Sequence, residues 1–298
     1  MIKNIITLLL LLNSFTTSAQ KIDKKLQRKL ETLIKGFNGQ AGIFVHDLKK
    51  NKIAHINADT VFTTASMVKI PILIGVADKL HKGELKYNQE LIYKDSLYYA
   101  GVDILGAFKS NEKIELGKVM MLMLTMSDNT ASLWLQSLAG GGARINEILD
   151  SLGFKSTRVN SRTPGREVQR NQYGWGQTTP KEMATLMEKI ANGEVISSAT
   201  SEKMLRLLGR NWWDENAISS VPPDVFVASK HGSLNQNRNE VLYVKGKGCR
   251  YVFCICTQNN KDQRWTPDNE AWVLAKGLSS LLWKHFSSTS KYTPTGSW

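Results

Sequence analysis

Ser66-Met67-Val68-Lys69 opens an apolar run that continues to Leu80. On a helix, the spacing S-x-x-K brings a hydroxyl and an amine to the same face. Two polar motifs follow at long range, Ser127-Asp128-Asn129 and Lys230-His231-Gly232. An isolated S-x-x-K carries little weight, because four residues match by chance in many chains. The ordered set of three motifs is far more specific, and both the fold and the function are inferred from it.

The first motif supplies a nucleophile and a base. A serine hydroxyl attacks a carbonyl only when a base takes its proton, so we expect Ser66 to attack and Lys69 to accept the proton. Lys69 can do this only if its pKa falls well below the usual value of about 10.4. Burial and a second cation, for which Lys230 is the candidate, would lower it. The alternative is an incidental Ser and Lys on a surface helix.

The backbone of the first motif also suits an oxyanion hole. At a helix N-terminus the N–H of Ser66 has no partner within the helix, and the helix dipole favours negative charge there. The backbone N–H of Ser233 is the expected second donor.

The other two motifs supply a proton relay and a substrate anchor. Ser127 would pass a proton to the leaving nitrogen of an amide, and Asn129 would bind an amide group of the substrate. Asp128 fits a structural role as a helix N-cap. Lys230, on a strand edge, would hold a substrate carboxylate, and Gly232 completes the substrate-binding motif.

Strand patterns lie near both ends of the chain and helical patterns fill its middle. Helices are expected at 21–36, 67–80, 114–126, 130–139, 145–152, 181–192 and 269–286, with Thr179 as an N-cap. Strands are expected at 41–48, 53–56, 225–229, 241–244 and 251–257, with turns at 49–52, 237–239 and 246–248.

This order predicts an α/β (α+β) fold. One antiparallel sheet, built from both ends of the chain, is covered by the terminal helices, and an all-helical lobe is inserted between its halves. The sheet lobe would span about 20–62 and 222–286, and the helical lobe about 63–221. The site would lie where the sheet and the lobe meet.

The first residues resemble a secretory signal peptide. A short basic start is followed by the apolar stretch Ile5 to Leu12 and by Thr17-Ser18-Ala19, which predicts cleavage after Ala19. The domains are then a signal peptide at 1–19, a catalytic domain at 20–286 and a polar tail at 287–298. The apolar stretch is too short to span a bilayer, so we expect an exported protein without a stable membrane anchor.

The formal net charge is +13, and removal of Lys3 with the signal peptide leaves 13 − 1 = +12. Such a charge can attract anionic cell-wall polymers, membrane surfaces or nucleic acid. The lysines are scattered along the sequence, and export argues against nucleic acid, so no nucleic-acid partner is expected.

No metal or cofactor is expected. The five histidines are dispersed and form no H-x-H or H-E-x-x-H motif, and no glycine-rich phosphate loop follows a strand. Of the three cysteines, Cys254 and Cys256 alternate within an apolar run and would face the same side of a strand. Buried thiols fit this spacing better than a disulfide bond, and a bond from Cys249 is disfavoured.

The three motifs, in this order and across essentially the whole mature chain, resemble the class A β-lactamase family of penicillin-recognising serine hydrolases. The segment Gly101-Val102-Asp103-Ile104-Leu105 before the second motif is also similar. The resemblance implies attack on a cyclic amide by Ser66, an acyl-enzyme and its hydrolysis, with a β-lactam as substrate. It also implies a bacterial periplasmic location, and we expect a monomer.

Three departures from the family pattern concern the site. His231 stands where the family has Ser or Thr; it could donate to the substrate carboxylate or simply pack. In a shortened loop, Glu167 and Asn171 have the spacing of the pair that activates the deacylating water, although Glu167 could equally be a surface carboxylate. Arg238 could replace an arginine that supports the carboxylate pocket in the family.

Two other functions share the acylation residues. One is a peptidoglycan D-Ala-D-Ala peptidase, or a related serine hydrolase, with poor β-lactam turnover and peptidoglycan peptides as partners. The other is a non-hydrolysing β-lactam or cell-wall binder. Glu167 separates them from a β-lactamase, since rapid hydrolysis requires a base that reaches the acyl carbonyl through a water.

Overall fold

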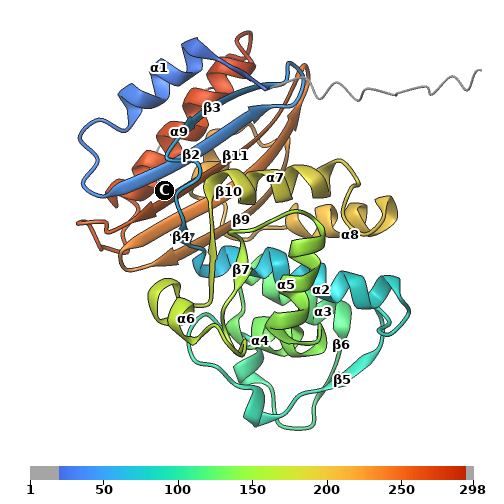
Figure 1. The fold of residues 1–298 in the computed structure, drawn as a ribbon. Helices are drawn as coiled ribbons and strands as arrows, with labels where there is room; N and C mark the ends of the chain where they lie inside the picture. Colours follow the sequence, from blue (N-terminus) through green and yellow to red (C-terminus); the bar gives the residue numbers. More distant parts are fainter. Residues whose placement is uncertain (1–19, 293–298) are drawn as a thin grey trace, which may run out of the picture.

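The computed structural model describes residues 20–292. The predicted signal peptide and the last residues of the polar tail lie outside this range. Within it, the chain forms an antiparallel-dominated sheet and a helical lobe, as Figure 1 shows. The predicted α/β fold is confirmed.

The main sheet has six strands and combines both ends of the chain. Its order is β1-β3-β2-β11-β10-β9, and β1 pairs with β3 in parallel while the other pairs are antiparallel. Its strands are β1 (Lys21–Ile22), β2 (Gln40–Asp47), β3 (Lys52–Ile56), β9 (Phe226–Leu234), β10 (Asn237–Gly246) and β11 (Cys249–Gln258). β9 is an edge strand, so one of its edges is free to face the helical lobe.

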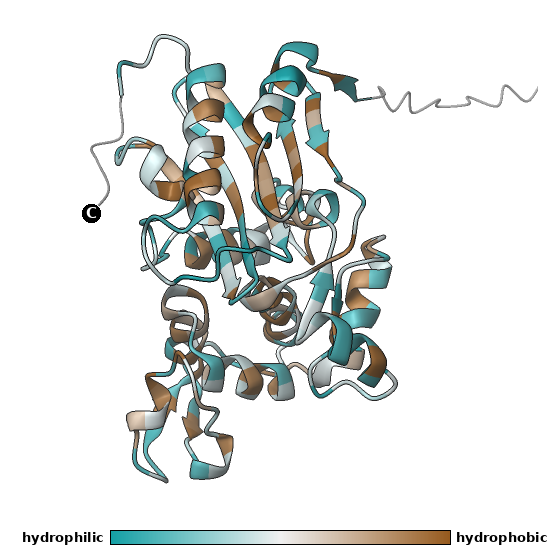
Figure 2. Cartoon of the chain, turned by 90° about the vertical axis from the view of Figure 1, so that its left-hand side faces the viewer, coloured by the Kyte–Doolittle hydropathy of each residue, from teal (hydrophilic) through white to brown (hydrophobic). Residues whose placement is uncertain are grey.

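One face of the sheet is covered by the two terminal helices, α1 (Lys24–Leu33) and α9 (Glu270–Phe286). Alternate strand residues such as Ile43, Leu242 and Phe253 pack there against Leu30 and Leu278. Strands coloured by hydropathy carry brown segments beneath these helices (Figure 2). This arrangement follows from the period of two in a strand, which directs every second side chain to the same layer.

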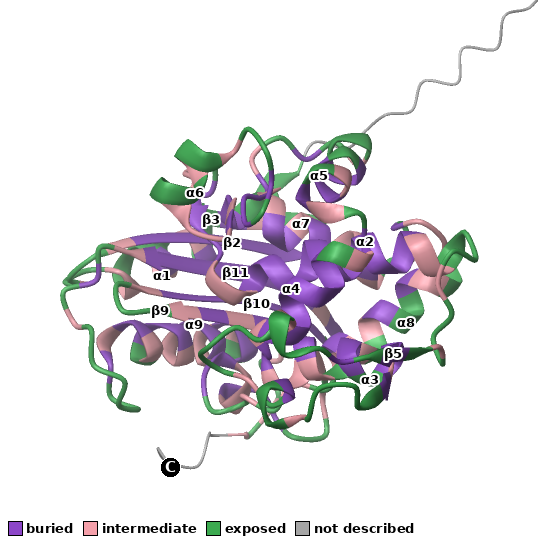
Figure 3. Ribbon diagram, turned by 90° about the horizontal axis from the view of Figure 1, so that it is seen from below, coloured by how far each residue is buried: buried purple, intermediate pink, exposed green. Residues whose placement is uncertain are grey.

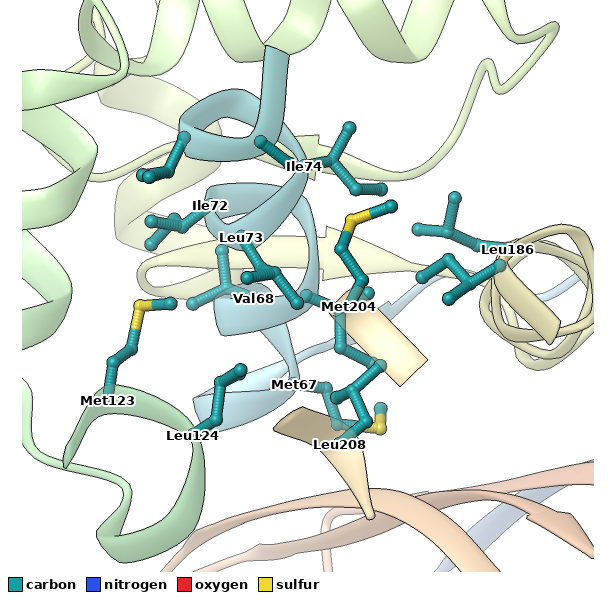
Figure 4. Close-up of a cluster of buried hydrophobic side chains, with 14 of the residues drawn as sticks. Met67, Val68, Ile72, Leu73, Ile74, Met123, Leu124, Leu186, Met204 and Leu208 are labelled. Carbon is teal, nitrogen blue, oxygen red and sulfur yellow. The ribbon is translucent and has the colours of Figure 1, made fainter. Parts of the chain in front are cut away.

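The opposite face is covered by the helical part of the chain. α2 (Lys69–His81), α7 (Pro180–Ala191) and α8 (Ser198–Leu208) share one apolar core with the inner sheet residues, and Figure 4 shows part of it around Met67, Leu73 and Met204. Figure 3 shows α2 and α4 as mostly buried ribbon at the centre of the molecule.

The remaining helices are α3 (Leu116–Met121), α4 (Asn129–Leu138), α5 (Gly141–Ser151) and α6 (Glu167–Tyr173), with the short turns η1 (Ala65–Val68), η2 (Asp95–Leu97), η3 (Leu105–Ala107), η4 (Leu122–Met126) and η5 (Ala217–Ser220). The small sheets contain β4 (Phe62–Thr63), β7 (Arg158–Val159) and β8 (Gly176–Thr178), and β5 (Glu90–Ile92) with β6 (Lys113–Glu115).

Side-chain caps explain where several helices begin. The Thr179 hydroxyl accepts a hydrogen bond from Glu182 N at 3.1 Å and Pro180 takes the first helical position, as the sequence predicts. Asn269 caps α9 in the same way, accepting from Ala271 N at 3.1 Å. Such caps satisfy backbone donors that would otherwise lack partners.

The three cysteines are free and buried, in agreement with the sequence. Cys254 and Cys256 both enter the core beneath the helical lobe, with their sulfur atoms 3.7 Å apart, whereas Cys249 belongs to the core under α9. Burial raises the pKa of the Cys254 thiol well above its usual value. Among residues 20–292, every helix is too short or too polar to cross a membrane.

The sheet differs from the sequence prediction at the β9–β10 hairpin. β9 continues through Lys230 to Leu234, and the turn lies at Asn235 and Gln236 rather than at 237–239. Arg238 and Asn239 suggest a turn by composition, but both are buried within β10. Their polar groups bond to backbone atoms of neighbouring segments, which is why two polar residues are tolerated inside a strand.

We predict that Gly42→Ala destabilises the protein by about 1–3 kcal/mol, because overpacking a tight core forces its neighbours to move. A Cβ atom at Gly42 would lie 2.5 Å from the ring of Phe62 and 2.9 Å from Pro180, and Phe62 is fully buried. Thermal unfolding would measure the loss.

Gly277→Ala is the matched control. Its Cβ atom would meet only Leu33 at an ordinary 3.5 Å, within helix α9. We expect this variant to gain about 0.5–1 kcal/mol from helix propensity. Equal melting temperatures for the two variants would contradict the packing argument.

Candidate active site

Ser66 and Lys69 lie at the junction of η1 and α2, as the S-x-x-K spacing predicts. The fully buried Nζ of Lys69 lies 3.1 Å from Ser66 Oγ, 3.0 Å from Ser127 Oγ, 2.6 Å from Ser127 O and 2.9 Å from Asn129 Oδ1. One amine therefore joins the first two motifs in a single hydrogen-bonded cluster.

The surroundings of Lys69 favour its neutral form. Burial, followed by the positive charge of Lys230, lowers the pKa of Lys69 well below its usual value, and Asp128 opposes this only in part. A neutral amine has a lone pair that can accept the proton of Ser66, while its own two protons can go to Ser127 O and Asn129 Oδ1. This geometry fits a general base.

Ser127 occupies a strained turn between two helical segments. Its φ of 63° lies in the left-handed region, directly after the π-helical turn η4. Strained backbone and π-turns of this kind cluster at functional sites. Asp128 has the structural role that the sequence predicts: it caps α4 through Ala131 N at 2.7 Å, and it also accepts from Ile104 N at 2.6 Å.

Lys230 reaches the same cluster from the sheet. Its buried Nζ lies 3.2 Å from Ser127 Oγ and 3.0 Å from the backbone oxygen of His231. Burial lowers the pKa of Lys230 to about 7, and the nearby Glu240 counteracts this shift. The structure thus brings together all four residues that the motifs single out for acylation.

Gly232 allows β9 to approach the reactive serine closely. A Cβ atom there would lie 2.5 Å from Thr64 O and 2.6 Å from Ser66 N, which no other residue could accept without movement. The next residue, Ser233, lines the same pocket as Ser66. Two backbone segments therefore meet where the sequence analysis expects the oxyanion hole.

His231 also lines the pocket, beside Trp213, with ring centroids 6.1 Å apart. Its Nδ1 is buried without a hydrogen-bond partner within residues 20–292. Burial, then Lys230 and Lys69, lower the pKa of His231 well below its usual value, so the ring is neutral. A neutral imidazole with a buried polar atom left unpaired can still bond to a ligand.

Glu240 is a buried carboxyl group that the sequence analysis missed. It lies directly opposite His231 in the β9–β10 ladder, and it accepts from Ala217 N at 3.0 Å. Burial raises the pKa of Glu240 to about 8, so the group is neutral at physiological pH. An acidic residue directly beside an apolar strand run was the sequence feature that could have indicated Glu240.

Arg238 does not point into the pocket as the sequence analysis expects. Its guanidinium donates to backbone oxygens of Leu234, Asn235, Asn237 and Arg264, and it lies over the rings of Trp265 and Trp272 at 4.3 and 4.7 Å. The guanidinium group is already engaged with these partners, so Arg238 packs against the Trp265 and Trp272 rings and is not available to a substrate carboxylate.

Glu167 and Asn171 are not brought to the cluster. Both are exposed on α6, and Glu167 Oε1 accepts from the backbone N–H of Gly165 at 3.1 Å. This position at the start of a helix suits a carboxylate electrostatically. Arg166 turns inward instead and donates to Asn160 Oδ1 at 2.6 Å, so the loop presents a different face from the one the sequence analysis expects.

The cluster opens into a pocket of about 400 Å³. Ser66, Ser127, His231 and Ser233 line it, together with three tryptophans, Trp213, Trp265 and Trp272. Within residues 20–292, no group of His, Cys, Asp and Glu side chains could hold a metal ion.

Comparison with solved structures agrees with this fold. The structure of PBP-A superposes with a TM-score of 0.79 at 24% identity, covering 90% of this chain and 98% of that one. A class A β-lactamase from Bacteroides cellulosilyticus gives a TM-score of 0.77 at 19% identity, covering 89% and 98% of the two chains. At these identities the likeness shows the fold alone.

Comparison of sequences identifies the family. Beta-lactamase VEB-1 from Pseudomonas aeruginosa is 24% identical over 240 residues, covering 77% of this chain and 79% of that protein. The model of the beta-lactamase enzyme family matches residues 25–286, which is nearly all of the described chain. The chain therefore belongs to the beta-lactamase enzyme family, and its fold is that of the class A members.

Proposed function

We propose that this protein is a serine hydrolase in which Ser66 attacks the amide carbonyl of a β-lactam or of a D-alanyl peptide. The observation that carries the proposal is the buried Lys69 amine, which lies within 3.1 Å of Ser66 Oγ and of Ser127 Oγ. One PBP-A variant is known as an acyl-enzyme complex with penicillin G, which supports this substrate class.

Acylation then follows from the positions of four side chains. Lys69 takes the Ser66 proton as Oγ bonds to the carbonyl carbon, and the backbone N–H groups of Ser66 and Ser233 stabilise the oxyanion. When the carbon–nitrogen bond breaks, the proton moves from Lys69 through Ser127 to the leaving nitrogen. Ser127 can relay it because its Oγ lies 3.0 Å from Lys69 Nζ and 3.2 Å from Lys230 Nζ.

Lys230 and His231 would bind the substrate carboxylate. Lys230 supplies the charge, and His231 supplies an N–H donor where the family has a hydroxyl group. Since the ring is neutral, it donates from one nitrogen and accepts at the other. Gly232 keeps this strand close enough for both residues to reach a substrate bound at Ser66.

The fate of the acyl-enzyme separates a β-lactamase from a peptidase. Rapid hydrolysis requires a base beside the acyl carbonyl, and the exposed carboxylate of Glu167 is bonded to Gly165 N instead. A peptide releases its leaving amine, which opens the site to water, whereas a β-lactam keeps the amine tethered. The arrangement therefore favours a D-Ala-D-Ala peptidase, or a related serine hydrolase, that turns over β-lactams slowly.

We predict a persistent covalent adduct when the protein is mixed with benzylpenicillin, and no adduct with Ser66→Ala. An intact-mass time course measures both, and Ser110→Ala, at an exposed loop position, is the matched control. Labelling of Ser66→Ala would refute the assignment of the nucleophile. Rapid disappearance of the adduct with accumulation of hydrolysed product would establish a β-lactamase instead.

We predict that Glu167→Gln leaves the lifetime of the penicillin adduct unchanged within about twofold. The reason is that Glu167 is exposed and bonds to the backbone of its own loop. The adduct mass is followed after excess penicillin is removed. A lifetime prolonged tenfold or more would restore Glu167 as the water-activating base, since general bases contribute about 10²–10⁴ in rate.

We predict that the carboxylate anchor weakens as pH rises through about 7, the pKa of Lys230. Below that pH Lys230 is a cation and attracts the substrate carboxylate; above it the charge is lost. The value of about 7 already includes the opposing influence of Glu240.

The test compares benzylpenicillin with its methyl ester, which lacks the carboxylate. Both need the same base, so the ratio of their second-order acylation rate constants isolates the anchor. The ratio of acid to ester should fall between pH 6 and pH 9, with its midpoint at about 7. A constant ratio would show that Lys230 is not the cation that attracts the substrate carboxylate.

A further inference from the structure

The positive charge of this chain is concentrated at one end of the main sheet. The basic end is defined by ten side chains that are scattered in sequence: Lys21, Lys24, Lys25, Lys49, Lys50, Lys52, Lys245, Lys247, Arg250 and Lys284. Nine are exposed and Arg250 is half-buried. The mature net charge is 13 − 1 = +12, and ten of the positive charges of the chain lie in this one region.

Strand pairing brings these residues together. Lys21 pairs with Lys52 across β1 and β3, and Lys245 pairs with Arg250 across β10 and β11. The β2–β3 and β10–β11 hairpins meet where Lys49 Nζ donates to the backbone oxygen of Gly248 at 3.1 Å. The β2–β3 turn, the β10–β11 turn and the start of α1 therefore form one surface (Figure 1).

Helix α9 ends at the same surface. His285 Nε2 lies 3.0 Å from Asp23 Oδ2 at the start of α1, and the ring of Trp283 is the nearest neighbour of Gly246 on the helix side. Lys284 lies between these two contacts in the sequence. Neighbouring strands are spaced about 4.8 Å apart, so the strand ends from β1 to β10 span about 20 Å.

Three carboxylates in this region are already engaged. Asp23 caps α1 and contacts His285, and Asp47 accepts from Lys49 N at 2.9 Å to close its turn. On the neighbouring α7, Glu188 lies 2.8 Å from His46 Nδ1. Asp224, just before β9, is the other nearby acid.

None of the ten cations forms an ion pair within 4 Å among residues 20–292. Elsewhere in the same range several cations do pair with acids, as in Lys82 with Asp78 or Arg144 with Glu147. Ten unpaired cations on one surface repel one another, so an anionic partner would stabilise the arrangement.

We propose that the basic end binds the surface of an anionic lipid membrane. A membrane offers a broad, flat array of negative headgroups, which matches a surface of strand ends and turns about 20 Å wide. The exposed side chain of Ile22, 43% accessible between Lys21 and Lys24, suits the boundary between headgroups and acyl chains. Gln20 also lies here, with its Nε2 3.5 Å from His46 Nε2.

This orientation keeps the Ser66 pocket accessible. Phe226 begins β9 opposite Lys245 at the basic end, whereas the pocket residues His231 and Ser233 lie five and seven positions further along the strand. At about 3.4 Å per residue, that places them roughly 17–24 Å from the basic end. The proposal is independent of the function proposed for the pocket.

The test is co-sedimentation of the secreted protein, its N-terminus established by intact mass, with lipid vesicles. We expect binding when phosphatidylglycerol makes up a third of the lipid and none with phosphatidylcholine alone. Binding should be lost in 1 M salt, where charges are screened within about 3 Å. Reversal of three charges, Lys49→Glu/Lys50→Glu/Lys247→Glu, should lower the partition coefficient at least about tenfold.

The matched control reverses three exposed lysines outside the basic end, Lys86→Glu/Lys109→Glu/Lys203→Glu. It changes the net charge equally, and we expect it to lower binding much less. Penicillin labelling of Ser66 and the melting temperature show that both variants fold. Equal loss in the two variants, equal binding to both lipids, or binding to soluble polyphosphate without binding to vesicles would overturn the proposal.

Discussion

The site depends on one buried amine. Lys69 has no exposed surface, yet it lies against oxygen atoms of Ser66, Ser127 and Asn129, which come from two segments far apart in the sequence. Burying a charged ammonium group is costly, so the protein favours the neutral form and leaves a lone pair directed at the reactive hydroxyl. The positions of η1, of the strained turn at Ser127 and of β9 all serve to enclose this amine.

The clustering of the motif residues could be predicted from sequence because the chemistry proposed for them demands particular residue types in a particular order. Ser66, Lys69, Ser127 and Lys230 meet as the motifs indicate. Glu167 shows the limit of the same reasoning. Its spacing to Asn171 is correct for a pair on one helix face, but both side chains are exposed, and Arg166, just before α6, is the residue that turns inward to Asn160.

Strand β10 shows a second limit. Arg238 and Asn239 belong to the turn predicted at 237–239, yet both are buried, against the rings of Trp265 and Trp272 and the backbone of Thr63. Glu240, which the sequence analysis missed, is buried beside them and accepts from the N–H of Ala217. Such partners come from distant segments, so no local pattern indicates them. Composition predicts where polar groups are placed at the surface, and it fails where tertiary contacts satisfy them in the interior.

The pairing of β2 with β11 has a consequence for the order of folding. Gln40 bonds to Gln258, 218 positions further along, whereas the helical lobe is continuous in sequence. Contacts between distant segments form slowly, so the local contacts of the helical lobe can form first. The sheet can form only when the last third of the chain, which contains β9 to β11, is present. Until then the β2–β3 hairpin stands alone, and an isolated hairpin is only marginally stable in water. A chain cut before β11 would thus retain Ser66, Lys69 and Lys230 but lose the strand that joins β2 to β10.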